Sequence, residues 1–247
     1  MVRGLIVPDR LRRPRELAFI AVDRAALALG AGDVISEGGP DRPAVALSFD
    51  DGPSPDNTPE LLDLLLEHDA RATFFVVGES IQGQEAILER AVSLGHEIGN
   101  HTYSHPHTAY LRTGEIVDEV VRTNEAISSV GAKARLIRPP FGKDRWRMTR
   151  VARRLGMDVA LWSLDSGDTR ASSAAEIAAG VMGRVGGGAI VLFHDGGERR
   201  PRTLEACAEI LPALTASGLR AVTITDLVGG GGVAVNSRAD RFSATER

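Results

Sequence analysis

Two adjacent carboxylates, Asp50 and Asp51, stand where an apolar run ends and a turn begins. The run over residues 45–49 is typical of a buried strand, and Gly52-Pro53 ends it. Neighbouring side chains on a strand point in opposite directions, so the two carboxylates could take different roles, one as a metal ligand and the other as a base. The alternative is a polar turn in which aspartate caps backbone N–H groups. The pair alone does not decide between these interpretations.

A pair of histidines, His101 and His105, follows a later predicted strand at a spacing of four residues. Two histidines on one turn can both face a single metal ion. Together with Asp51 they form a set of two imidazoles and one carboxylate, which leaves an open position and is typical of a catalytic Zn²⁺ site. Surface histidines also occur in pairs, so this pattern gains weight only with Asp51. We interpret the nearby His107 as an exposed loop histidine rather than a fourth ligand.

Three further segments place polar groups at the ends of predicted strands. They are Arg138 to Gly142, Asp165 to Asp168, and Leu192 to His194. A buried arginine needs a carboxylate partner, and Asp50 is a candidate. The prolines after Arg138 leave few backbone donors, and the N–H of Phe141 is one of them; the alternative is an ordinary turn rich in proline and glycine. Because five strand ends carry such groups, a ring of active-site residues is the simpler interpretation.

These groups must be positioned by an alternating series of strands and helices. The predicted strands cover residues 45–49, 72–78, 96–100, 134–138, 158–162, 188–193 and 220–224. One predicted helix begins at Thr58, and the others cover residues 80–94, 115–130, 146–155, 173–185 and 202–217. Repeated βα units favour an α/β fold with about seven parallel strands and outer helices. A distorted TIM-like barrel and a doubly wound sheet both remain open from the pattern.

Length and composition narrow the class of protein. The 247 residues suit one large domain with extensions, and the net charge of −4 argues against nucleic acid as a partner. The single cysteine excludes an intrachain disulfide, and no apolar run approaches the roughly 18 residues of a spanning helix. We predict a helical N-terminal extension over residues 1–43, a catalytic domain over 44–228 and a flexible tail over 229–247. Charges at Asp23-Arg24 interrupt an otherwise signal-like segment, which favours a cytoplasmic protein over a secreted or cell-envelope one.

The motifs, taken together and in order, resemble those of the polysaccharide deacetylases, the NodB-like carbohydrate esterases. The resemblance covers residues 44 to about 227. Its first motif is present as Ser48 to Gly52, the second as His101 to His105, the third as Arg138 to Gly142 and the fifth as Leu192 to His194. The fourth motif, Asp165 to Asp168, departs from the family because Thr169 stands where a tryptophan is usual. The resemblance implies the distorted (β/α) barrel of the NodB homology domain.

The resemblance also implies a role for each motif residue. Asp51, His101 and His105 would bind a divalent metal ion, with Zn²⁺ expected and Co²⁺, Ni²⁺ or Mn²⁺ as alternatives. The implied catalytic groups are Asp50 as general base, Arg138 to hold it, His194 as general acid, Asp168 or Asp165 to tune that histidine, and the N–H of Phe141 for the oxyanion. Asp168 is the preferred aspartate, and Leu192 would line the pocket for the acetyl methyl group.

These roles describe a metal-dependent hydrolase that removes the acetyl group from an N-acetylated amino sugar. A chitooligosaccharide, a peptidoglycan-type glycan and a sugar conjugate all fit. Because only 4% of the residues are aromatic, we favour a short oligosaccharide or a conjugate. Two alternatives remain: a catalytically silent carbohydrate-binding relative, and a hydrolase of another non-peptide C–N bond. The sequence carries no indication of the oligomeric state.

Overall fold

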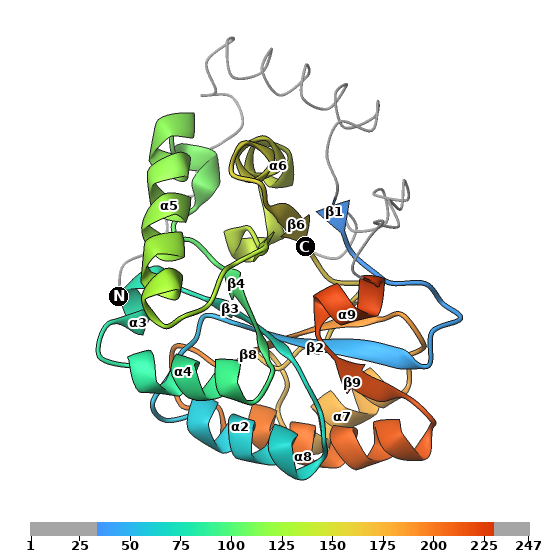
Figure 1. The fold of residues 1–247 in the computed structure, drawn as a ribbon. Helices are drawn as coiled ribbons and strands as arrows, with labels where there is room; N and C mark the ends of the chain where they lie inside the picture. The colour runs from blue at the N-terminus through green and yellow to red at the C-terminus, as the bar shows by residue number, and fades with distance from the viewer. Residues whose placement is uncertain (1–33, 230–247) are drawn as a thin grey trace.

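The computed structural model describes residues 34–229. Its strands are β1 Val34–Ile35, β2 Ala44–Asp50, β3 Thr73–Val76, β4 Glu97–Asn100, β5 Leu136–Ile137, β6 Asp158–Ala160, β7 Leu164–Asp165, β8 Ile190–His194 and β9 Arg220–Val222. Its helices are α2 Thr58–Glu67, α3 Gly78–Ile81, α4 Glu85–Ser93, α5 Thr113–Ser129, α6 Arg145–Arg154, α7 Ala174–Met182, α8 Pro201–Ala216 and α9 Ile224–Val228, with short 3₁₀ turns η2 Thr108–Tyr110 and η3 Pro140–Gly142. Figure 1 shows the helices arranged around the sheet.

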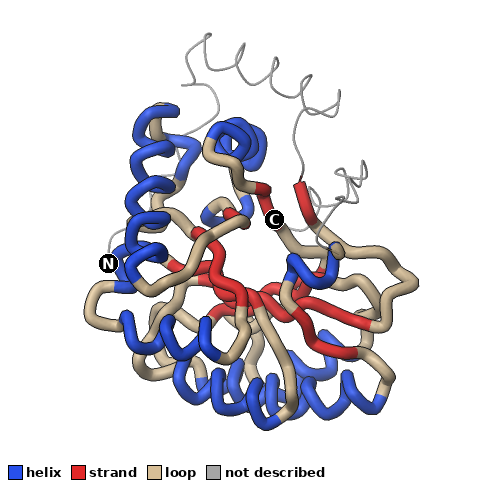
Figure 2. Tube along the Cα trace, in the orientation of Figure 1, coloured by secondary structure: helices blue, strands red, loops and turns tan. Residues whose placement is uncertain are grey.

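The strands form one parallel sheet that curls into a distorted barrel. Their order is β1-β6-β5-β4-β3-β2-β8-β7, and β9 pairs with the start of β2. Strands β6 and β7 stand at opposite parts of this order, yet they follow each other in the chain with only residues 161–163 between them. That single segment therefore joins the two sides of the sheet, and the strands surround a common centre in Figure 2. Of the two folds that the sequence pattern left open, the structure confirms the distorted (β/α) barrel and not the doubly wound sheet.

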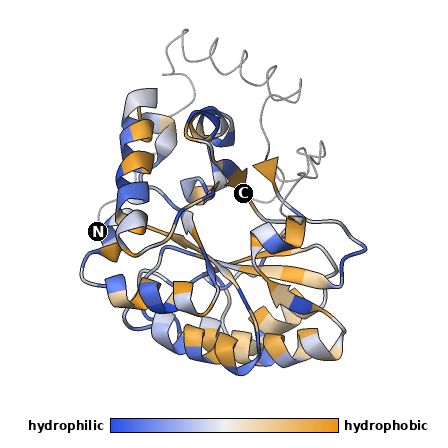
Figure 3. Cartoon of the chain, viewed as in Figure 1, coloured by the Kyte–Doolittle hydropathy of each residue, from blue (hydrophilic) through white to orange (hydrophobic). Residues whose placement is uncertain are grey.

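Alternation along β2 separates two cores and determines the face on which Asp50 lies. Val45, Leu47 and Phe49 belong to the large core between the sheet and the outer helices. Ala44 and Ala46 belong to a smaller core inside the barrel. Asp50 continues this inner set because side chains two apart share a face. In Figure 3 the strands are mostly orange, whereas the surrounding helices carry both apolar and polar residues.

Several elements differ from the sequence-based expectation. The described part of the predicted helical extension, residues 34–43, holds strand β1 instead of a helix, and Val34 and Ile35 pair with β6. The predicted helix over residues 80–94 is divided into α3 and α4 at Gly83, whose φ of +78° suits glycine. Strand β7 and helix α9 were not predicted. The rest of the extension and nearly all of the predicted tail lie outside the described residues.

All seven predicted strands are present, with boundaries that differ by a few residues at most. Their carboxyl ends lie at one mouth of the barrel, which is where the motif residues are found. Within residues 34–229, no helix combines the length and the apolar character that crossing a bilayer requires.

Candidate metal and catalytic site

Asp50 lies at the end of β2 and is bound by a buried arginine. The Nη1 group of Arg138 donates to Oδ1 of Asp50 at 2.6 Å, and both side chains are almost inaccessible to solvent. Its Nε and Nη2 groups donate to the carbonyl oxygens of Ala160 and Leu161, at 3.3 and 2.9 Å. The guanidinium also lies over the ring of Phe75, 4.0 Å from its centre. The pairing that the sequence suggested is thus present, and the arginine has partners for its charge on several sides.

Burial raises the pKa of Asp50, and the charges of Arg138 and His194 oppose that shift. A carboxylate with a raised pKa is a stronger proton acceptor than an exposed one. His194 is also the direct cross-strand neighbour of Asp50, because the two residues are register partners between β2 and β8. The geometry therefore places a candidate base and a candidate acid side by side on adjacent strands.

Asp51, His101 and His105 converge as the sequence predicted. Oδ1 of Asp51 lies 3.6 Å from Nε2 of His101 and 3.3 Å from Nε2 of His105. One ligand atom from each residue falls within 4.8 Å of the others. Oδ1 of Asp51 is buried and has no hydrogen-bond partner among the described residues. A buried carboxylate oxygen without a donor is costly, and a cation between these three groups would satisfy it. The residues present thus fit a divalent metal ion.

The tautomer of His101 is fixed by the backbone. Its Nδ1 lies 2.8 Å from the carbonyl oxygen of Arg138, which can only accept, so Nδ1 carries the hydrogen. Nε2 then presents its lone pair toward Asp51, as a metal ligand must. Burial lowers the pKa of His101 to about 3, and the neighbouring Asp51 only partly opposes this. This imidazole is therefore neutral at physiological pH.

The loop between the two histidines is held by helix α5. The carboxylate of Glu119 accepts hydrogen bonds from the backbone N–H groups of Tyr103 and Ser104, at 2.9 and 2.8 Å. Two non-glycine residues in this loop, Thr102 and His105, have φ of +68° and +50°. Such backbone is unfavourable for residues with a side chain, so the loop depends on contacts of this kind. The sequence analysis missed Glu119, and no spacing signal points to it.

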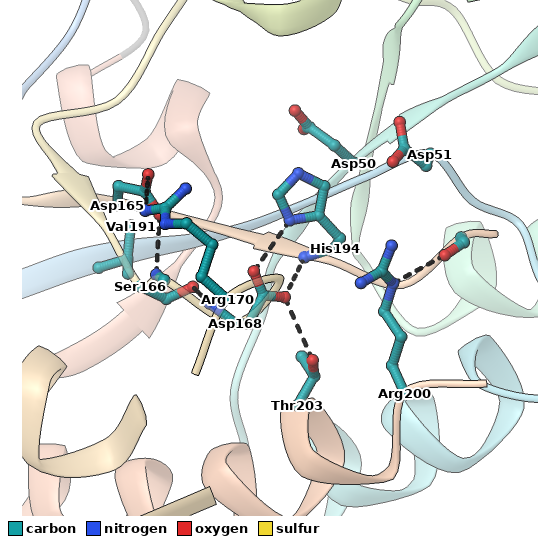
Figure 4. A network of polar contacts seen from close by, with 12 residues as sticks. Asp50, Asp51, Asp165, Ser166, Asp168, Arg170, Val191, His194, Arg200 and Thr203 are labelled. Carbon is teal, nitrogen blue, oxygen red and sulfur yellow. Dashed lines mark hydrogen bonds and ion pairs between the residues drawn. The ribbon is translucent and has the colours of Figure 1, made fainter. Parts of the chain in front are cut away.

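His194 is bound to a carboxylate instead of a carbonyl (Figure 4). Its Nδ1 lies 2.9 Å from Oδ1 of Asp168, and its backbone N–H donates to Oδ2 of the same residue at 2.8 Å. Thr203 donates a further hydrogen bond to Oδ2. Burial opposes protonation of His194, but the hydrogen bond and the negative charge of Asp168 outweigh it, so the pKa of His194 is raised. The same contacts lower the pKa of Asp168 against its own burial.

The two aspartates of the fourth motif, Asp165 and Asp168, have different hydrogen-bond partners. Asp165 accepts hydrogen bonds from the backbone of Gly167 and from Arg170, and neither contact involves His194. Asp168 is therefore the partner of the histidine. Thr169 follows it in an exposed turn, so no large side chain stands at the position of the family tryptophan. Leu192 is buried on the same face of β8 as His194.

Phe141 lies in η3 with a φ of +60°, and its backbone N–H has no acceptor among residues 34–229. Its ring is half exposed and packs edge-on against His105, with ring centres 4.7 Å apart. His107 stacks on the other part of this ring at 4.0 Å and is not one of the three convergent metal-ligand candidates. Its interpretation as an exposed loop histidine agrees with its accessibility.

Asp195 is a buried carboxyl group that the sequence analysis quoted without giving it a role. Its backbone N–H donates to the carbonyl oxygen of Asp50 at 3.0 Å, and its Oδ2 accepts from Thr58 at 2.6 Å. Burial and the charges of Asp51 and Asp50 raise the pKa of Asp195 to about 7. A Cβ atom at Gly52 would lie 2.5 Å from Oδ2 of Asp195. The glycine of the first motif is therefore required by its close packing against Asp195, next to Asp50 and Asp51. In the sequence, the only indication of Asp195 was its position directly after His194.

Comparison with known proteins identifies the family. The family model described as polysaccharide deacetylase matches residues 37–160. The chain belongs to the polysaccharide deacetylase family. A peptidoglycan-N-acetylglucosamine deacetylase of Bacillus cereus is 34% identical over 186 residues, which cover 74% of this chain and 87% of the relative. A chitooligosaccharide deacetylase of Bradyrhizobium is 36% identical over 188 residues, which cover 71% and 86%. The resemblance inferred from the motifs is confirmed.

Solved structures of the family share this fold. A peptidoglycan N-acetylglucosamine deacetylase in complex with 4-naphthalen-1-yl-N-oxidanyl-benzamide superposes with a TM-score of 0.76 at 32% identity, covering 81% of this chain and 94% of that one. A pseudoenzyme of the same family from Bacillus anthracis reaches a TM-score of 0.74 at 29% identity, covering 79% and 68%. The barrel fold alone therefore does not separate active members of the family from silent ones. That difference must lie in the residues at the barrel mouth.

Proposed function

We infer that this chain is a metal-dependent N-deacetylase that hydrolyses the acetamide of an N-acetylated amino sugar and releases acetate. The observation that carries the proposal is the arrangement at the barrel mouth. A buried base, Asp50, and a carboxylate-bound histidine, His194, lie on adjacent strands, and the three candidate metal ligands lie beside the base. Relatives named as deacetylases of peptidoglycan and of chitooligosaccharides support the same class of reaction.

The residues of the chain divide the reaction between them. Asp50 accepts a proton from the water that attacks the acetyl carbon, and Arg138 keeps that carboxylate oriented. The N–H of Phe141 donates to the carbonyl oxygen as negative charge develops there. His194 gives its proton to the nitrogen as the C–N bond breaks, so the products are acetate and a free amine. His194 can do this because Asp168 favours its cationic form.

A divalent cation held by Asp51, His101 and His105 would acidify water and polarise the acetyl carbonyl. Two imidazoles and a carboxylate with an open position are typical of catalytic Zn²⁺, so we propose Zn²⁺ before Co²⁺, Ni²⁺ or Mn²⁺. The neutral state of His101 supports this, because a protonated imidazole cannot bind a metal.

Acetate release from N-acetylglucosamine oligomers tests the proposal. The purified chain should release acetate, lose this activity on chelation, and regain it when one of the four metals is added. Asp50→Asn should keep the metal and lose turnover, whereas Asp51→Asn should weaken metal binding itself. Binding of oligomers without any acetate release would instead identify a silent relative. Hydrolysis of a cyclic amide and not of the oligomers would favour the other class of C–N hydrolase.

The substrate class bears on location. Because several relatives are named for peptidoglycan, we propose a cell-envelope glycan as one candidate substrate beside chitooligosaccharides. A substrate of that kind favours the cell envelope, in contrast to the cytoplasmic location that the sequence analysis expected. Fractionation of cells with an antibody against the chain distinguishes the two.

A further inference from the structure

Positive charge is concentrated in one segment of a chain whose net charge is −4. Residues 131–155 contain nine of the 29 lysine and arginine residues and only one of the 33 acidic residues, Asp144. Two of the nine have tasks already described or a close partner, because Arg138 binds Asp50 and Arg147 pairs with Asp144. Helix α6 carries four others that the proposed deacetylation does not use: Arg145, Arg150, Arg153 and Arg154.

The helical period brings three of the α6 arginines to one face. Arg147, Arg150 and Arg154 follow one another at spacings of three and four residues, so their side chains share a side of the helix. Helix α5 packs against α6 (Figure 1). A hollow of about 240 Å³ is lined by these three arginines, by Val151 and by Thr113, the first residue of α5. An arginine-rich segment thus becomes a concave, positively charged surface.

Part of this lining is fixed before any ligand arrives. Arg147 donates from Nη1 to the carbonyl oxygen of Leu111 at 2.7 Å and from Nη2 to that of Thr108 at 2.6 Å. Its Nε donates to Asp144 at 3.0 Å. Arg150 and Arg154 are exposed, so a ligand that enters from the solvent meets their guanidinium groups.

A second hollow, on another face of α6, has a different character. It is lined by Thr149, Arg153, Gly156, Met157 and Asp158. A single arginine there is accompanied by an acidic residue, which disfavours an anion. Arg153 is as exposed to solvent as its neighbour Arg154 but lies outside the first hollow. The two adjacent arginines therefore offer an internal comparison.

We propose that the hollow between α5 and α6, which we call the arginine hollow, binds a phosphate group carried by an anionic polymer. Guanidinium groups match the geometry of phosphate oxygens, and a phosphate presents oxygens in several directions to donors that surround it. The volume is smaller than the roughly 300 Å³ or more of sites for drug-sized ligands, so a small group fits better than a large molecule. This ligand is distinct from the glycan, and its binding does not depend on the proposed deacetylation.

The partner is a polymer because exposed cations continue beyond the hollow, at Lys143 and Arg153. A chain with repeated phosphate groups can contact these as well, whereas a single ion cannot. A membrane is disfavoured because helices that lie on bilayers present large apolar side chains to the lipid. Within residues 34–229 the exposed side chains of that kind are Leu66, Tyr110 and Phe141, and none of them lies on α6.

Titration calorimetry with a short sodium polyphosphate tests the proposal. Arg154→Gln should weaken binding about tenfold, as expected for loss of one charge-assisted hydrogen bond. Thr113→Val, which changes no charge, should weaken binding about fivefold through loss of the hydroxyl. Arg153→Gln makes the same change of charge outside the hollow, so its Kd should stay within about twofold of the wild-type value. Equal losses in Arg153→Gln and Arg154→Gln, or no loss in Arg154→Gln, overturn the proposal.

Two further ligands separate phosphate from other anions and a polymer from a membrane. Poly-L-glutamate of matched charge should bind the wild-type chain more weakly than polyphosphate, and equal binding of the two polymers overturns the phosphate assignment. Vesicles that contain phosphatidylglycerol should bind no more tightly than neutral vesicles. Binding to the anionic vesicles without binding to polyphosphate identifies a membrane surface and overturns the polymer. None of these measurements uses acetate release, so their outcome is independent of the proposed function.

Discussion

Two histidines at the same barrel mouth, His101 and His194, are prepared for opposite charge states. Each is largely buried, and each has its Nδ1 engaged by a single acceptor. The acceptor of His101 is a neutral carbonyl oxygen, and burial lowers the pKa of that histidine to about 3. The acceptor of His194 is the carboxylate of Asp168, and its pKa is raised. The charge of a buried imidazole is therefore set by the atom behind it and not by burial alone.

The comparison also explains how one fold can place a metal ligand beside an acid. A ligand histidine must stay neutral, and a histidine that protonates a leaving amine must be cationic at the start. Asp50 ends β2 and Asp51 follows it directly, and the histidines approach these carboxylates from the ends of β4 and β8. Changing the partner of one histidine should consequently leave the charge state of the other intact.

Removing each imidazole should give the largest effects. His194→Ala should lower turnover by on the order of 10²- to 10⁴-fold, the usual contribution of an acid–base group, and keep the metal. His101→Ala should lose most turnover together with the metal, because a ligand is gone. Elemental analysis and acetate release, measured on both variants, check the distinction. Full metal occupancy in His101→Ala, or wild-type rates in His194→Ala, would contradict the two assignments.

Changing the acceptor behind His194 should have an intermediate effect. The histidine is active as the cation, so activity falls as pH rises through its pKa, and the raised pKa extends activity to higher pH. Asp168→Asn removes the negative partner, so the alkaline limb of the pH–rate profile should move to lower pH. At mildly alkaline pH, turnover should fall by on the order of 10- to 100-fold, less than on loss of the imidazole.

Asp165→Asn is the matched control for that change. Its carboxylate contacts Gly167 and Arg170 and has no contact with His194. The alkaline limb should therefore stay in place in this variant. A shift of equal size in both variants would mean that the limb reports the overall charge of the loop and not the Asp168 contact.

The smallest effect concerns the exposed turn beside Asp168. Thr169→Trp would place an aromatic ring directly after Asp168, the hydrogen-bond partner of His194. Packing one such ring against a sugar contributes about 1 kcal/mol, so KM for chitooligosaccharides should fall roughly fivefold. The metal content and the pH–rate profile should not change. An unaltered or higher KM would show that another side chain already occupies the space.

The strands and most of the site were predictable because their signals are local. The run before Asp50, the histidine spacing of four and the prolines after Arg138 each lie within one short segment. Strands β1 and β7 have only two residues each, too few for any periodicity to appear. Helix α9 follows directly after β9, where the pattern predicted a strand up to residue 224.

Other features depend on contacts between distant segments, which a single sequence does not reveal. Asp165 and Asp168 have the same residue type three positions apart, and only the path of the turn decides which one meets His194. The support of the histidine loop by Glu119 and the stacking of His107 on Phe141 join separate segments in the same way. Periodicity within one element carries no information about such pairs.

The position of the Arg138 side chain has a mechanical consequence. Its guanidinium binds Asp50 and also the carbonyl oxygens of Ala160 and Leu161, at the start of the segment that leads through β7 to Asp168. The position of Asp50 relative to the segment that leads to Asp168 is thus determined within the wall of the barrel. Loops at the barrel mouth can therefore change in length or sequence without moving Asp50 relative to its guanidinium partner.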